Sequence, residues 1–112
     1  MKVDVTTVDG AKVVTLDGEI DASTAGAVQQ QILVLIQPQV QLLLDMTRVS
    51  YMSSAGLRVL LSVYRQVDGR QGKIVLVGLA EQIRDTMDTT GFLKFFTVCD
   101  DLRAGMEALG RG

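Results

Sequence analysis

A transition from strand to helix lies in the stretch VSYMSSAGLRVLL, residues 49–61. After its two serines, apolar residues recur at helical spacing and predict a helix from Ser54 to about Val67, with Leu57, Leu60, Leu61 and Tyr64 on its buried face. A serine at the start of a helix commonly caps it, because its side-chain oxygen accepts a hydrogen bond from a first-turn N–H group that has no partner within the helix. One hydroxyl of the pair Ser53 and Ser54 can therefore satisfy the helix, while the other is left to face a partner.

The strands predicted around this helix point to a mostly parallel sheet. Two short runs rich in valine, 3–8 and 13–16, flank Asp9-Gly10, which is a strong signal for a hairpin turn. The segment 40–44 is almost continuously apolar, as is typical of a strand covered on both faces in a parallel sheet. Further strands are predicted at 74–77 and 95–99.

Three further helices are predicted from apolar residues at helical spacing: Ala25, Val28, Ile32, Leu35 and Ile36 in the first, Leu79, Ile83 and Met87 in the second, and Leu102, Met106 and Leu109 in the last. Asp21 or Ser23 can cap the first of these helices, and Asp100 or Asp101 the last. Gly91 suits a left-handed ending of the second. Strands that alternate with helices after an initial hairpin predict an α/β fold with a mixed, mostly parallel sheet.

Length and composition predict a single domain, residues 1–112, that folds on its own. The chain is 47% hydrophobic and has a formal net charge of −2, so it offers no basic face for nucleic acid and no polybasic anchor for an anionic membrane. No apolar run approaches the length of about 20 residues that spans a bilayer. Cys99 is the single cysteine and cannot form an internal disulfide, so we expect a cytoplasmic protein whose partners are other proteins.

No common catalytic or metal-binding arrangement of residues is visible in this sequence. It contains no histidine, which removes the usual general base and the commonest metal ligand. The glycine-rich loop at 69–73 follows a helix and precedes a strand, whereas a phosphate-binding loop has the opposite order. The acidic residues Asp17, Glu19 and Asp21 lack the spacing of a calcium loop and suit turn and capping roles. We therefore expect a protein that is not an enzyme and that holds neither a metal nor another cofactor.

The stretch LLLDMTRVSYMSSAGL, residues 42–57, resembles the signature of the STAS domain, in particular that of the bacterial anti-sigma factor antagonists. The family pattern is an apolar strand, then an aromatic residue, and then Asp-Ser-Ser-Gly or Asp-Ser-Thr-Gly at the start of a helix. The segment LDGEID at 16–21 resembles the second-strand motif of the family, and Gly91-Phe92-Leu93 with Phe95 and Val98 resembles its last strand. The resemblance implies a single STAS-like α/β domain, with an N-terminal hairpin opening the sheet and about four helices.

The resemblance also implies a switch controlled by phosphorylation. In that family, the serine after the motif's Asp is phosphorylated by a kinase that doubles as the anti-sigma factor, and a phosphatase reverses the reaction. By position this serine is Ser54. The unmodified protein would bind the anti-sigma factor and free a sigma factor, and phosphorylation would end that binding. Ser53 replaces the motif's Asp and Ala55 its second Ser or Thr, so three versions stay open: modification at Ser54, less favourably at Ser53, or at neither.

The predicted partner-binding surface surrounds these serines. Its members are polar or charged residues near the expected starts of the helix that contains residues 25–36 and of the helix that begins at Ser54. They are Asp21, Ser23, Thr24, Ser53, Ser54 and Arg58. We expect the protein to be a monomer or a weak dimer. The alternative is a STAS scaffold or small-ligand sensor that is not phosphorylated and serves another signalling pathway.

Overall fold

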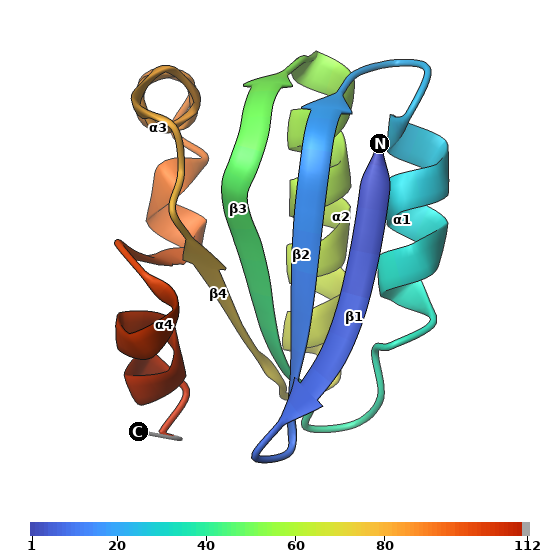
Figure 1. Ribbon diagram of the computed structural model, residues 1–112, viewed down its shortest axis with the longest axis vertical. Coiled ribbons are helices and arrows are strands. Elements are labelled where there is room, and N and C mark those ends of the chain that lie inside the picture. The colour runs from blue at the N-terminus through green and yellow to red at the C-terminus, as the bar shows by residue number, and fades with distance from the viewer. Residues whose placement is uncertain (111–112) are drawn as a thin grey trace.

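The computed structural model describes residues 1–110 and shows one five-stranded sheet with helices on both faces (Figure 1). The strands are β1 (Lys2–Val8), β2 (Ala11–Ile20), β3 (Gln41–Met52), β4 (Lys73–Val77) and β5 (Thr97–Cys99), in the spatial order β1-β2-β3-β4-β5. The helices are α1 (Ala25–Leu33), α2 (Ser54–Gly69), α3 (Glu81–Thr89) and α4 (Leu102–Ala108), with a short 3-10 helix, η1, at Leu93–Phe95. The predicted fold class is confirmed.

The sheet is mixed because only β1 runs against its neighbour. β1 pairs with β2 antiparallel, and every later pair is parallel. Asp9 and Gly10 form the hairpin turn with positive φ angles of 49° and 82°, the conformation that a two-residue turn of the I′ type requires at both positions. The hairpin that this dipeptide predicts is confirmed.

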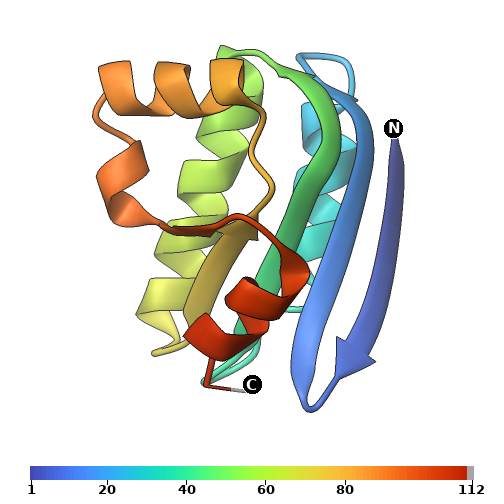
Figure 2. The same ribbon diagram turned by 60° about the vertical axis from the view of Figure 1, so that its left-hand side comes forward.

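The two faces of the sheet are covered unequally. α1, α2 and α3 pack on one face, where they share a core with Leu42 and Leu44 of β3. On the other face, a smaller core formed around Leu43 and Val75 is closed by Leu109, just beyond α4. Figure 2 shows α4 in front of the lower part of β3 and β4, with α2 behind them. The predicted cover on both faces is thus confirmed for 42–44, but the strand itself continues to Met52.

Two helices differ in detail from the sequence-based predictions. α1 ends at Leu33, and the chain tightens into turns in which the N–H groups of Leu35 and Ile36 donate to carbonyls three residues earlier, so both residues pack on the core from outside the helix. α2 buries a wider arc than predicted, because it packs on the sheet and also against α1 beside it, and so adds Val59, Val63 and Val67 to Leu57 and Leu60. Leu61 and Tyr64 are only half-buried.

The C-terminal part also differs from its prediction. Strand β5 begins at Thr97, and the predicted first strand residue, Phe95, lies in η1 with 42% of its surface exposed. Leu102 is exposed as well, because α4 approaches the sheet through Gly105, where a Cβ atom would come within 2.8 Å of Leu43. The predictions for two helix ends are confirmed: Asp101 caps α4, and Gly91 follows α3 with a φ of 82°.

Candidate partner-docking site

Parallel pairing of β2 and β3 brings two distant segments of the chain together at one edge of the sheet. Ile20 and Met52, the last residues of these strands, are register partners. The N–H group of Ser53 donates to the carbonyl oxygen of Ile20 over 2.9 Å. The loop that begins at Asp21 and the start of α2 therefore lie side by side, at the top of Figure 1.

A glycine sets how closely α2 approaches these strand ends. A Cβ atom on Gly56 would overlap the Cγ atom of Met52 and lie 2.9 Å from the carbonyl oxygen of Ile20. A larger residue would thus push the first turn of α2 away from the sheet. The close contact fixes where Ser54 stands relative to the loop after β2.

The two adjacent serines divide their roles as the sequence predicts. Ser53 is the N-cap of α2, and its half-buried side chain accepts a hydrogen bond of 3.2 Å from the N–H group of Ala55. Ser54 is the first residue of the helix and is exposed. Among residues 1–110, its hydroxyl has no hydrogen-bond partner. Of the two hydroxyls, that of Ser54 is the one open to another molecule.

The loop after β2 is organised around the carboxylate of Asp21. Its Oδ1 atom accepts hydrogen bonds from the hydroxyl and the N–H group of Ser23, over 2.6 Å and 2.9 Å, and from the N–H group of Thr24 over 3.2 Å. The hydroxyl bond from Ser23, followed by the backbone bond from the same residue, holds the pKa of Asp21 below its ordinary value of 3.8. This loop is locally ordered and carries a negative charge.

The prediction that Asp21 or Ser23 caps α1 needs a correction. The N-cap is Thr24, which makes no capping bond with its side chain, because its hydroxyl instead donates to the carbonyl oxygen of Glu19 over 2.8 Å. The first N–H group of the helix, that of Ala25, donates to the backbone carbonyl of Asp21 over 2.8 Å. Asp21 therefore shapes the turn before the helix, and Ser23 is left exposed beside it.

Arg58 completes the set of predicted site residues. It lies one helical turn after Ser54, and residues four apart are neighbours on a helix surface. Its side chain is exposed, and no ion pair involving it occurs in the described part of the chain. The predicted residues from the β2–α1 loop and from the first turns of α2 thus gather at one edge of the molecule.

The structure adds neighbours that sequence reasoning missed. Tyr51 is 51% exposed, and a hollow of about 100 Å³ beside it is lined by the end of β3 and by α3, through Ser50, Tyr51, Met52, Gln82, Ile83 and Thr86. The position of α3 across the end of β3 comes from tertiary packing, so no local pattern could place Gln82 or Thr86 here. The available signal for Tyr51 was an aromatic residue between Ser50 and Met52, directly before the two serines.

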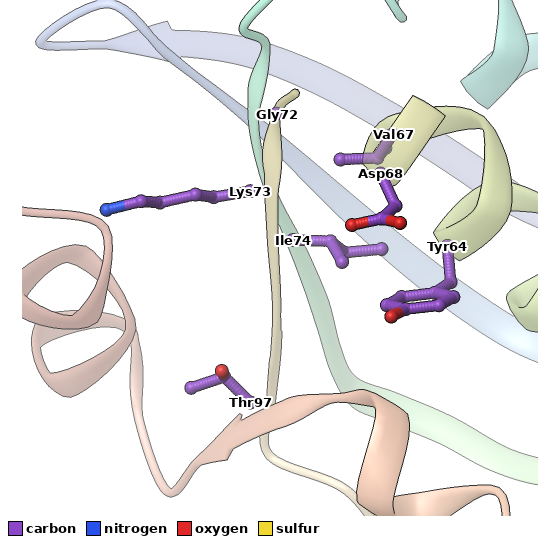
Figure 3. A pocket seen from close by; sticks show the side chains of 7 residues that line it. All are labelled: Tyr64, Val67, Asp68, Gly72, Lys73, Ile74 and Thr97. Atoms are coloured by element: carbon purple, nitrogen blue, oxygen red, sulfur yellow. The ribbon is translucent and has the colours of Figure 1, made fainter. Parts of the chain in front are cut away.

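Other hollows lie elsewhere and are also small. The one in Figure 3, of about 150 Å³, lies beside β4 at the far end of α2 from Ser54. There Tyr64 and Asp68 lie on one side of β4, while the side chain of Lys73 points to the other. Small-molecule sites usually measure about 300 to 1,000 Å³. In residues 1–110, no cluster of acidic or sulfur ligands suits a metal ion, and no helix is long and apolar enough to cross a bilayer.

Solved structures of similar fold define the class of this molecule. A crystal structure of an anti-sigma factor antagonist from Mycobacterium paratuberculosis superposes with a TM-score of 0.87 at 28% identity, covering 97% of this chain and 93% of the other. The phosphorylated form of SpoIIAA, a cell fate determinant of Bacillus, has a TM-score of 0.73 at 17% identity over 96% of this chain and 99% of the other. The chain therefore has the α/β fold of the anti-sigma factor antagonist from Mycobacterium paratuberculosis and of SpoIIAA.

The sequence comparisons identify the family. A model described as the STAS domain matches residues 2–105. BtrV of Bordetella bronchiseptica, a protein assigned as an anti-sigma factor antagonist, is 31% identical over 109 residues, which cover 96% of this chain and 94% of BtrV. The chain belongs to the STAS domain family.

Proposed function

We propose that this STAS domain is a cytoplasmic anti-sigma factor antagonist, a regulator rather than an enzyme, whose binding is controlled by phosphorylation of Ser54. Its partner is an anti-sigma factor that is also a serine kinase, and a phosphatase restores the unmodified form. The observation that carries the proposal is the exposed, unbonded hydroxyl of Ser54 at the start of α2, beside the ordered loop of Asp21. BtrV and the Mycobacterium protein support the choice of partner.

The geometry favours Ser54 over Ser53 as the phosphate acceptor. The hydroxyl of Ser53 is half-buried and already bonded to the N–H group of Ala55, so its modification would remove the helix cap. Modification of Ser54 breaks no hydrogen bond in residues 1–110. A kinase can therefore reach Ser54 without disturbing the fold.

Phosphorylation would act on the docking surface and leave the fold intact. A phosphoserine carries about −1.5 to −2 charges at neutral pH. On this edge it adds to the carboxylate of Asp21 and must lose its hydration against a partner surface shaped for a hydroxyl. A penalty of about 2.7 kcal/mol would lower the affinity about 100-fold.

The proposal is tested with the purified anti-sigma factor kinase of the producing organism and ATP. We expect phosphate at Ser54 by mass spectrometry, and weaker binding of the kinase to Ser54→Asp than to the unmodified protein in calorimetry. Ser54→Ala should bind but accept no phosphate, and Ser53→Ala serves as the control that keeps Ser54. Equal affinity of wild type, Ser54→Asp and Ser54→Ala would overturn the switch, and phosphate on Ser53 would move it by one residue.

A further inference from the structure

An exposed ridge of α2 leads away from Ser54. Arg58, Leu61 and Arg65 follow Ser54 at i+4, i+7 and i+11, and at 3.6 residues per turn all four lie within an arc of about 60° on the helix surface. The ridge is about 16 Å long, from the helix rise of about 1.5 Å per residue. It joins the phosphate acceptor to a part of the surface that the proposed function does not use.

The ridge ends at an apolar hollow. This hollow has a volume of about 200 Å³ and is lined by Leu61, Tyr64, Arg65, Phe92 and Phe95. Its wall is aromatic: the ring of Tyr64 lies 5.5 Å from those of Phe95 and Phe96, measured between centroids. Phe95 keeps 42% of its surface exposed at the rim, although burial of such an apolar side chain is favourable.

The charged groups placed at this hollow by its lining and by the ring of Phe95 are cations. Arg65 is the single charged residue that lines it, and the Lys94 ammonium lies 5.6 Å from the ring centroid of Phe95. Within residues 1–110, Arg58, Arg65 and Lys94 take part in no ion pair. The chain as a whole has a net charge of −2, so this cationic border is a local feature. Asp68, which lies three residues beyond Arg65, lines the separate hollow of Figure 3.

We propose that the anti-sigma factor docks along this ridge as well as at Ser54, and that it inserts one apolar side chain, flanked by Asp or Glu residues, into the hollow of Leu61, Tyr64, Phe92 and Phe95. This proposal rests on the proposed function and extends its interface. The volume suits a side chain better than a free ligand, since ligand sites usually begin at about 300 Å³. Partner carboxylates match the unpaired Arg58 and Arg65, and aromatic and arginine residues are those that most often anchor protein interfaces.

The test measures affinity for the purified anti-sigma factor kinase by calorimetry. Phe95→Ala removes the rim of the hollow, and Arg65→Glu reverses its charge. We expect each to weaken binding about tenfold or more, with the Arg65→Glu effect shrinking as salt screens the charges. Arg103→Glu is the matched control, because it reverses one charge on α4, on the opposite face of the sheet, and should bind like wild type. Thermal unfolding of each variant shows that it is folded.

The outcomes separate this proposal from the one on which it rests. If wild type binds the kinase and both variants bind equally well, the ridge is not part of the interface, while the switch at Ser54 stands. If wild type itself does not bind, the proposed function fails and this extension fails with it. If Arg103→Glu weakens kinase binding as much as Arg65→Glu does, the effect comes from the net charge of the protein and not from the ridge, and the proposal is overturned. Saturable binding of phenylacetate in the hollow, seen as NMR shifts at Phe95, together with unchanged kinase affinity of Phe95→Ala and Arg65→Glu, would instead assign the hollow to a small carboxylate.

Discussion

The two halves of β3 differ in how they are covered. Residues 42–44 are fully buried, with α1 and α2 on one side and the α4 region on the other. Beyond Asp45, which is the last residue to pair with β4, the strand continues alone beside β2, and Arg48, Ser50 and Tyr51 are exposed. One strand thus forms the centre of the core and, at its C-terminal end, supports Ser53 and Ser54.

The difference shows how a rigid fold presents the proposed docking site. The covered half holds the strand in register, and the half that extends past its cover carries the polar residues and the start of α2. Val49 and Met52 still face the helices, so this second half is anchored on one side only. The site therefore needs no flexible loop, since the end of a rigid element already places it at the surface.

The largest effect is expected from a substitution in the covered half of β3. Leu43→Ala removes a side chain that is fully buried between β4 and the α4 region and should lower the free energy of unfolding by about 3 kcal/mol. Ser50→Ala, in the uncovered half, should change it by less than about 0.5 kcal/mol. Urea unfolding followed by circular dichroism measures both. Similar losses of unfolding free energy in the two variants would show that the two halves of β3 contribute equally to stability.

The next effect tests the contact between α2 and the strand ends. Gly56→Ala places a Cβ atom against Met52 and the carbonyl of Ile20, so it should destabilise the protein by about 1 to 3 kcal/mol and also weaken capture of the kinase. Gly26→Ala in α1 is the matched control, because nothing lies within 4 Å of its added Cβ atom, and it should stabilise the helix by up to about 1 kcal/mol. A stable Gly56→Ala protein would contradict the close packing.

A smaller effect separates the two serines. Ser53→Ala removes the cap of α2 and should cost about 1 kcal/mol of unfolding free energy, whereas Ser54→Ala should stay within about 0.5 kcal/mol of wild type. Both values come from the same urea titration. A greater loss for Ser54→Ala than for Ser53→Ala would exchange the roles that the structure gives them.

The smallest effect concerns Asp21 and depends on pH. Its folded-state pKa lies below the ordinary 3.8 because of the bonds from Ser23, so its contribution to stability is present above that pH and is lost as the pH falls through the lower, folded value. Asp21→Asn should therefore lower the melting temperature slightly at pH 7, and the gap to wild type should close in acid. A gap that widens on acidification would contradict this sign.

Much of the fold follows from local patterns that packing does not override. The Asp9-Gly10 turn and the left-handed Gly91 depend on backbone geometry within a few residues, so the sequence alone predicts them. The sequence also predicts a cap from the pair Ser53 and Ser54 and from Asp100 or Asp101, and the structure selects Ser53 and Asp101. The positions of the predicted site residues also follow from the sequence alone, because each lies beside the end of a predicted strand or near the start of a predicted helix. That they function together stays a prediction until the partner is tested.

The sequence by itself determined the order of strands and helices, the buried centre of β3 and the presence of a serine cap at the start of α2. These features follow from apolar periodicity and from hydrogen bonds between near neighbours along the chain. Only the tertiary structure decided that β3 runs on to Met52, that α3 crosses its end, and that Phe95 stands at the rim of a hollow beside α2. A polar segment such as 45–51 becomes a strand only when another strand supplies its hydrogen bonds, and that pairing joins residues about 30 positions apart in the chain.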